Sequence, residues 1–144
     1  DPMWGPNKVK CAVSGCPRNC AESCIKDVGI ISVDSGWEIY VGGNGGIKTE
    51  AAQFLCKVKT SDEVLEYSGA FIQVYREEAR YLDRTVHWLE RVGLEYVKQR
   101  ILEDVEGRKT AYERLLYSLQ GAVDPWAERV NNRNKHKEFE IIEV

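Results

Sequence analysis

The chain has 144 residues, of which 43% are hydrophobic and 30% are charged, so the composition excludes a disordered or fibrous protein and predicts one compact domain. Its net charge of -3 argues against a dedicated binder of nucleic acid or membrane surfaces, because both functions need clustered positive charge. No segment approaches the ~18 apolar residues of a membrane span, and no basic segment followed by an apolar one resembles a secretory signal. We therefore expect a cytoplasmic protein with neither nucleic acid nor a membrane among its partners.

The first predicted elements are a strand and a short helix. Residues 8–13 alternate between apolar and polar side chains, which is typical of a half-buried strand with Cys11 and Val13 on its apolar face. Pro17 follows a Ser-Gly break, and proline is tolerated in the first turn of a helix, so a helix is predicted over residues 17–26. Cysteines therefore lie on the strand and along the helix.

A hairpin and a glycine-rich loop are predicted next. Residues 28–33 are apolar and β-branched, and residues 37–41 alternate, so the Asp-Ser-Gly turn between them predicts a β-hairpin. Residues 42–46 predict a loop in which the backbone comes close to a bulky group. Thr49 is predicted to cap a short helix over residues 50–55.

Helices dominate the sequence after residue 60. Thr60 and Glu63 have the spacing of a capping box and predict a helix that runs to about residue 82. Strands followed by helices predict an α+β fold, with a small mixed sheet and short helices followed by a helical C-terminal region. The remaining predictions are helices over residues 86–92, 94–103 and 108–119, a last helix from Asp124-Pro125, and a polar tail in which Phe139, Ile141 and Ile142 are candidates for a short strand.

Five cysteines are an odd number, and four of them fall between residues 11 and 24, which is too local for a disulfide scaffold. Cys16, Cys20 and Cys24 are spaced by four, so on a helix they project from nearly one face, beside Cys11 on the preceding strand. The start of this helix is expected to lower the thiol pKa and favour the thiolate that binds iron or zinc. A soft-metal site is the leading hypothesis, and simple packing is the alternative. Cys56 is interpreted as a core residue.

The cysteine spacing differs from two common metal motifs. A tetrahedral zinc site typically uses two CxxC pairs, and the ferredoxin motif needs CxxCxxC, and the sequence contains neither. His87 and His136 belong to no motif with a partner residue, and we interpret both as structural or solvated.

Several stretches of the chain resemble a known enzyme family. Ser14-Gly15-Cys16-Pro17-Arg18-Asn19-Cys20, followed six residues later by Asp27-Val28-Gly29-Ile30, resembles the signature of nitrite and sulfite reductases that carry sirohaem coupled to a 4Fe-4S cluster. The stretches over residues 36–46, 55–60 and 75–85 are similar to the C-terminal part of the large subunit of assimilatory NAD(P)H-dependent nitrite reductases. The resemblance covers roughly residues 6–104.

The resemblance implies a role for two of the cysteines. In that family the CxxxC motif supplies the second pair of cluster ligands, so Cys16 and Cys20 are expected to bind the 4Fe-4S cluster, and Cys20 is expected to bridge to the sirohaem iron. The implied reaction is the six-electron reduction of nitrite to ammonia, with the cluster supplying electrons to the sirohaem through the shared thiolate.

Neighbouring residues are also assigned under this hypothesis. Arg18 and Asn19 are expected to donate hydrogen bonds to cluster sulfur or to a carboxylate, and exposure to solvent is the equal alternative. The backbone of Gly43, Asn44 and Gly45 is expected to approach the negatively charged carboxylates of sirohaem, and an ordinary turn is the alternative.

Other parts of the family pattern lie outside this sequence. The first cluster pair, CxxxxxC, the substrate-binding arginines and lysines, and the modules for FAD and NAD(P)H are expected elsewhere in the parent enzyme. The chain is therefore expected to be an inactive fragment that needs the remainder of the large subunit, with a possible small subunit, to act on nitrite. Asp1-Pro2 before Met3 is interpreted as a vector remnant.

Two alternatives remain open at this point. One is a fragment of a sulfite reductase haemoprotein, and the other is a stand-alone iron-sulfur or zinc electron-transfer module that uses Cys11, Cys16, Cys20 and Cys24 together. The predicted regions are a partial cofactor-binding α/β region over residues 1–60, a helical region packing on it over residues 61–130, and the polar tail over residues 131–144.

Overall fold

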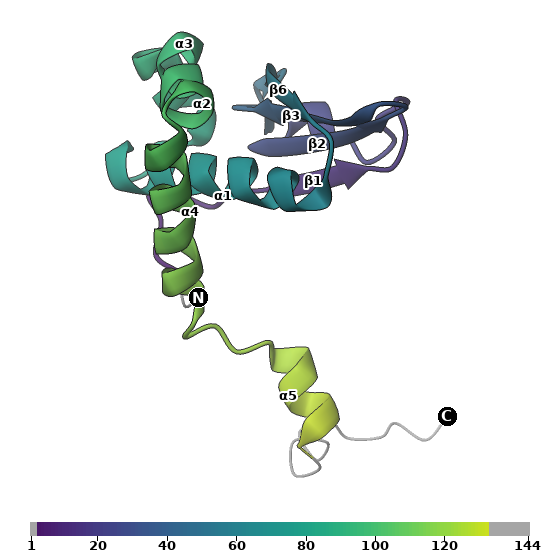
Figure 1. Cartoon of the computed structure of the whole chain (residues 1–144), viewed down its shortest axis with the longest axis vertical. Helices are drawn as coiled ribbons and strands as arrows, with labels where there is room; N and C mark the ends of the chain where they lie inside the picture. The colour runs from purple at the N-terminus through teal and green to yellow at the C-terminus, as the bar shows by residue number, and fades with distance from the viewer. Residues whose placement is uncertain (1–2, 133–144) are drawn as a thin grey trace.

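A four-stranded mixed sheet forms one half of the molecule in the computed structural model, which describes residues 3–132. Strand β1 pairs in parallel with β2, whereas β2 with β3 and β3 with β6 are antiparallel. The sheet lies beside the helices in Figure 1, which confirms the α+β prediction. Its strands, in spatial order, are β1 (Cys11–Ser14), β2 (Val28–Val33), β3 (Gly36–Val41) and β6 (Gln53–Val58).

The predicted hairpin between β2 and β3 is confirmed, but the first strand differs from the prediction. Strand β1 begins at Cys11 rather than at residue 8. Cys11 and Val13 are exposed and Ser14 is buried. The strand face that was expected to be buried is therefore the exposed one. The reason is that β1 is an edge strand, and the chain that follows it folds back over Ser14.

The helix predicted over residues 17–26 is wrong. Only a short 3-10 helix, η1 (Ser23–Ile25), forms in this segment. Asn19 and Glu22 have φ angles of 55° and 54°, and a left-handed residue interrupts a right-handed helix. Within this segment the side chain of Asn19 binds Ser14 and Ser23, so a succession of turns connects β1 to β2 in place of a continuous helix.

The helix predicted over residues 50–55 is also wrong. Strands β4 (Asn44–Gly45) and β5 (Thr49–Glu50) pair with each other, so Thr49 lies in a strand and does not cap a helix. In β6, Phe54 pairs with Tyr40 and Cys56 pairs with Ile39. Pairing with β3 therefore determines that this segment is a strand and not a helix.

The second half of the chain is helical, as predicted. Helix α1 (Ser61–Glu78) begins with the predicted capping box of Thr60 and Glu63, and it ends before residue 82. The helix predicted over residues 94–103 is divided into an α-helical and a π-helical part. The remaining elements are α2 (Thr85–Val92), α3 (Leu94–Lys98), the π-helix η2 (Gln99–Glu103), α4 (Val105–Leu119) and α5 (Pro125–Asn131).

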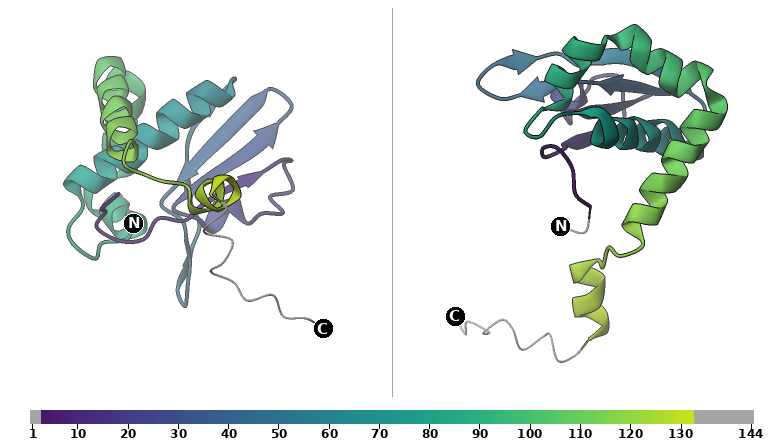
Figure 2. Two further views of the ribbon diagram at one scale, coloured as in Figure 1. Left: turned by 90° about the horizontal axis from the view of Figure 1, so that it is seen from below. Right: turned by 90° about the vertical axis from the view of Figure 1, so that its left-hand side faces the viewer.

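The core lies between the sheet and the helices. Helix α1 runs along the sheet and α4 packs across α1, whereas α5 stands apart from the body (Figures 1 and 2). Trp88 is fully buried, and its ring packs edge-on against Phe71 and Tyr75 at centroid distances of 5.7 and 5.8 Å. Ile39 and Val41 complete this core from the sheet, so residues far apart in sequence share one apolar centre.

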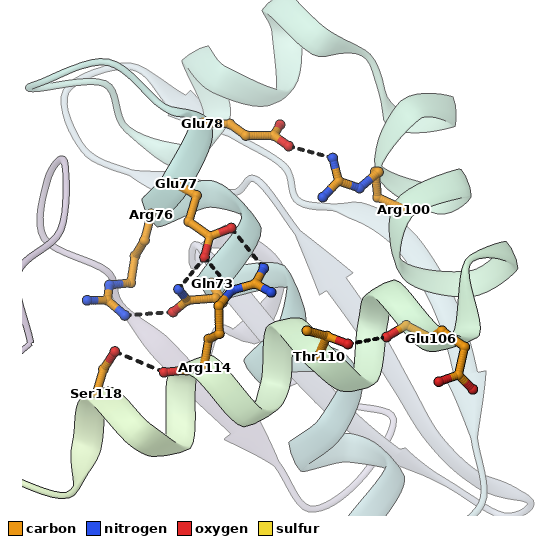
Figure 3. A network of polar contacts seen from close by, with 9 residues as sticks. All are labelled: Gln73, Arg76, Glu77, Glu78, Arg100, Glu106, Thr110, Arg114 and Ser118. Carbon is orange, nitrogen blue, oxygen red and sulfur yellow. Dashed lines mark hydrogen bonds and ion pairs between the residues drawn. The ribbon is translucent and has the colours of Figure 1, made fainter.

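Ion pairs reinforce the contact between α1 and the helices that cross it. Figure 3 shows Arg114 of α4 holding both oxygens of Glu77, with Nε and Nη2 at 2.8 and 3.0 Å. The neighbouring Glu78 accepts from Nη1 of Arg100 in η2 at 2.8 Å. Among residues 3–132, no helix combines the length and the apolar character that crossing a membrane requires.

Candidate functional site

Cys16 and Cys20 lie on a segment of consecutive tight turns, the cysteine loop (residues 15–26). Backbone bonds within this loop join residues three apart: the N–H of Asn19 donates to the carbonyl of Cys16 at 3.2 Å, and that of Glu22 to the carbonyl of Asn19 at 2.9 Å. The N–H of Ile25 donates to Glu22 at 3.1 Å. The loop therefore has a defined path although it contains no α-helix.

Three polar side chains fix this path from the inside, and we call them the Ser-Asn cluster (Ser14, Asn19 and Ser23). Oδ1 of Asn19 accepts from the backbone N–H of Ser23 at 2.7 Å and from the hydroxyl of Ser14 at 3.3 Å. The two serine hydroxyls lie 2.8 Å apart, and both serines are buried. The Asn19 side-chain oxygen therefore shapes the loop.

Below the Ser-Asn cluster the loop lies directly on β2. A Cβ atom placed on Gly29 would lie 2.1 Å from the carbonyl oxygen of Ser23, closer than any side chain can approach. Gly29 thus lets the cysteine loop contact the sheet backbone, and this explains a glycine inside an otherwise β-branched strand.

The cysteines differ in their exposure. All five are free thiols: Cys11 and Cys20 are exposed, and the other three, Cys16, Cys24 and Cys56, are partly buried. Within residues 3–132, no group of three or more histidine, cysteine or acidic side chains is arranged to hold a metal ion. Turns rather than one helical face separate Cys16, Cys20 and Cys24, so the shared helical face expected from their spacing does not form.

Burial raises the pKa of the Cys24 thiol, with a smaller contribution from Glu38. Burial also raises the pKa of Cys56 to about 11, and this residue packs against the core as predicted. The helix dipole expected at Cys16 is absent, since that helix does not form.

The glycine-rich segment, the glycine loop (residues 42–46), lies against the end of the cysteine loop. The N–H of Gly43 donates to the carbonyl of Lys26 at 2.9 Å. A Cβ atom on Gly43 would lie 2.6 Å from that same carbonyl oxygen, and one on Gly45 would lie 3.1 Å from Cδ1 of Ile25. The small size of these glycines therefore already serves a contact within the chain.

Asn44 and Arg18 were assigned to the cofactor site from the sequence, and the structure shows what each does within the chain. The side-chain amide of Asn44 donates to the carbonyl of Lys48 at 2.9 Å, across the turn between β4 and β5. Arg18 is exposed on the cysteine loop, and His87 is exposed on α2. The expected contact of Arg18 and Asn44 with a cofactor stays a prediction. The second histidine, His136, lies outside the described residues.

The donor set tests whether this site suits a 4Fe-4S cluster. Such a cluster takes four thiolate ligands. Cys16 and Cys20 are two free thiols on one short surface loop, which suits half of a cluster whose other ligands come from elsewhere. The residues present therefore fit as one half of a cluster site.

Sequence reasoning missed a buried carboxylate beside the two loops. Asp27 is fully buried between β1, β2 and the start of α2, where Arg84 binds it at 2.8 Å. The signal in the sequence was an acidic residue directly before an apolar strand, but its partner lies 57 residues away.

Comparisons with known proteins show the family of the chain. Residues 1–109 match the nitrite and sulphite reductase 4Fe-4S domain. The chain is similar to a nitrite reductase [NAD(P)H] of Bacillus subtilis, with 54% identity over 93% of this chain and 16% of that protein. It is 38% identical to the nitrite reductase (NADH) large subunit of Escherichia coli, again over 93% of this chain and 16% of that protein.

The chain is also similar to a sulfite reductase. An assimilatory-type sulfite reductase of Nitratidesulfovibrio vulgaris is 34% identical over 67% of this chain and 44% of that protein. The chain thus spans about a sixth of the length of the nitrite reductases that it matches. With the family match covering residues 1–109 and carrying the cysteine loop, the chain belongs to the nitrite and sulphite reductase 4Fe-4S domain family.

Proposed function

We propose that this chain is the C-terminal part of the large subunit of a cytoplasmic NAD(P)H-dependent nitrite reductase. The observation that carries the proposal is the Cys-Pro-Arg-Asn-Cys segment, which the cysteine loop holds at the surface with Cys20 exposed and Cys16 partly exposed. The 54% identity to the Bacillus subtilis nitrite reductase supports it. The whole reaction takes nitrite, six electrons and eight protons to ammonium and two waters, with NAD(P)H as the electron donor.

In this proposal Cys16 and Cys20 would be two of the four cluster ligands, and Cys20 would also hold the sirohaem iron. When bound, the cluster supplies electrons and the sirohaem supplies the iron at which nitrite is reduced. The Ser-Asn cluster orients the loop that carries both thiols. Arg18 lies exposed on the same loop and is proposed to donate a hydrogen bond to cluster sulfur or to a cofactor carboxylate.

The partners follow from what the chain would supply. Residues 1–60 would form part of the cofactor site, and residues 61–130 would pack on it. Of the polar tail predicted over residues 131–144, residues 133–144 lie outside the described residues. The remainder of the large subunit would supply the other cluster thiols, the nitrite-binding cations and the FAD and NAD(P)H modules, and a small subunit is a further proposed partner. We therefore propose that the chain is inactive by itself.

A sulfite reductase haemoprotein is the second candidate, and the Nitratidesulfovibrio vulgaris relative supports it at 34% identity over 67% of the chain. Two nitrite reductases match over 93% of the chain, at 54% and 38% identity, and this wider and stronger match favours the nitrite reductase. Comparing nitrite and sulfite turnover by the full-length enzyme separates these two candidates.

The test compares the chain alone with the full-length large subunit, each reconstituted with iron, sulfide and sirohaem. We expect cluster absorption only in the full-length protein, which should also reduce nitrite to ammonia. Cluster uptake by the chain alone that Cys11→Ser or Cys24→Ser abolishes would instead favour the stand-alone module. Full-length protein that binds cluster and sirohaem but turns over sulfite and not nitrite would favour the second candidate.

A further inference from the structure

Asp27 directly precedes β2, and both oxygens of its fully buried side chain have partners. Oδ2 accepts from the backbone N–H of Lys10 at 2.8 Å and from Nη2 of Arg84 at 2.8 Å. Oδ1 accepts from the hydroxyl of Thr85, which is also fully buried. The carboxylate therefore joins the start of β1 to the start of α2.

The backbone around Asp27 holds the glycine loop. The carbonyl of Asp27 accepts from the N–H of Gly42 at 3.0 Å, and the carbonyl of Lys26 accepts from the N–H of Gly43 at 2.9 Å. These bonds place the glycine loop against the end of the cysteine loop. Four segments thus meet at one residue: the start of β1, the cysteine loop, the glycine loop and the start of α2.

Stability alone explains this arrangement poorly. Burying an ion pair removes two charges from water, and a well-packed apolar pair of similar volume is often as stable or more so. The side chain of Arg84 is only 16% exposed, and among the described residues its buried Nε has no hydrogen-bond partner. The positive end of α2 offsets part of the cost for Asp27 but none for Arg84. A buried, incompletely bonded ion pair at a junction of loops is better explained by the geometry it imposes.

We propose that the buried ion pair between Asp27 and Arg84 is a positioning device for the cofactor site. It fixes the cysteine loop relative to the glycine loop and to α2, and so sets the direction in which Cys16 and Cys20 present their sulfur atoms. Neither Asp27 nor Arg84 contacts the cofactor in this role. The inference rests on the proposed function, because the thiols are taken as cluster ligands.

The experiment compares Asp27→Asn and Arg84→Lys in the full-length large subunit. Asp27→Asn keeps the shape of the side chain but removes its charge, and Arg84→Lys keeps the charge but removes the planar fork. The control is Glu78→Gln, which breaks the ion pair with Arg100 between α1 and η2 (Figure 3) and leaves both loops untouched.

Hydrogen exchange in cofactor-free protein is the first measurement. We expect the amides of Gly42 and Gly43 to exchange at least about tenfold faster in Asp27→Asn than in the unchanged protein, with a smaller increase in Arg84→Lys. The control should leave this segment unchanged. The second measurement is the electron paramagnetic resonance spectrum of the reduced cluster, which should change in Asp27→Asn and stay the same in Glu78→Gln.

The outcomes separate the positioning role from mere folding. A folded Asp27→Asn protein with unchanged exchange in residues 42–46 and an unchanged cluster spectrum overturns the proposal. An equal rise across the whole chain in all three variants also overturns it, since that result describes general destabilisation. If Asp27→Asn does not fold, Arg84→Lys is compared with the Glu78→Gln control in the same two measurements, and that result decides the proposal. If the protein without substitutions binds no cluster, the proposed function is contradicted. The hydrogen-exchange result still decides whether the ion pair between Asp27 and Arg84 orders the loops.

Discussion

The apolar core and the cysteine loop of this molecule are held together in different ways. Between α1, α2 and the sheet, large apolar side chains such as Phe71 and Trp88 fill a shared core, and ion pairs such as that of Glu77 with Arg114 lie at the surface. Around the cysteine loop, small polar side chains bind backbone groups instead, as Asn19 does with Ser23. The difference teaches that packing sets the frame of the protein, whereas a few hydrogen bonds and close backbone contacts set the geometry of the candidate site.

The largest expected effect contrasts the two kinds of cysteine. In the full-length enzyme, Cys20→Ser should abolish nitrite reduction, because it removes a proposed cluster ligand and the proposed bridge together. The loss should exceed the ~100-fold that is typical of residues that only support a metal ligand. Cys56→Ser should leave most activity, because the Cys56 thiol packs against the core and its pKa is raised to about 11. Iron and sulfide content and nitrite turnover are the measurements. Comparable turnover in the two variants contradicts the assignment of Cys20.

A second prediction tests the close approach of the two loops. Gly43→Ala should lower the free energy of unfolding by about 1–3 kcal/mol, because its Cβ would meet backbone atoms of Lys26 and Ile25 at 2.6 to 2.9 Å. Gly15→Ala is the matched control: no atom lies within 4 Å of its added Cβ, so a change within about 0.5 kcal/mol is expected. Denaturant unfolding followed by circular dichroism measures both. Equal effects of the two substitutions would mean that the loops do not pack as described.

A third prediction concerns the polar cluster inside the cysteine loop. Asn19→Ala should cost about 1–2 kcal/mol, because it leaves the Ser23 N–H unpaired and places alanine at a φ of 55°. Asn19→Asp keeps the accepting oxygen and should cost less than half as much. Denaturant unfolding and exchange of the Ser23 amide are the readouts. An alanine variant as stable as the aspartate variant would remove the Ser-Asn cluster from the explanation of the loop.

The smallest effect is expected in the helical half. Arg114 lowers the pKa of Glu77 from its usual value of 4.5, chiefly by hydrogen bonding, but both side chains are more than a third exposed. Glu77→Gln should therefore cost less than ~1 kcal/mol at neutral pH. Since the folded-state pKa is the lower one, this stabilisation is present above pH 4.5 and is lost as the pH falls below it.

Unfolding of both proteins across the acid range measures this difference. The gap between Glu77→Gln and the unchanged protein should close as the pH falls below 4.5. A gap that persists at lower pH would show that Glu77 contributes through packing and not through its charge.

Regular apolar patterns made most of the fold predictable. The alternation of β3 and the capping box of α1 are local signals, and both elements form where the sequence indicates. The two wrong helices have different causes. Residues 50–55 join strands because Phe54 pairs with Tyr40 on another strand. The segment after Pro17 turns because Asn19 binds its near neighbours Ser14 and Ser23, and the spacing of the cysteines does not reveal these local bonds.

The candidate site was predictable to the extent that its motif is local. Cys16 and Cys20 are identified by their spacing and by the resemblance of the residues around them, and the structure adds that Cys20 is exposed and Cys16 partly so. The role of Asp27 was not predictable, since its partner Arg84 lies in another element and nothing in the local sequence names it. Likewise, the glycines at 43 and 45 indicated a close approach but not that Lys26 and Ile25 are what they approach.

Under the proposed function, the exposure of Cys20 and the partial exposure of Cys16 have a consequence for biogenesis. Two sulfurs here and two on another stretch of polypeptide would make the inorganic core a link between these two parts of the subunit. Metal binding and folding are thermodynamically coupled in such sites, so iron supply would govern how long the nascent subunit remains open at this seam. Cells short of iron should then accumulate a form cleaved by proteases at this seam before they accumulate an intact, inactive one.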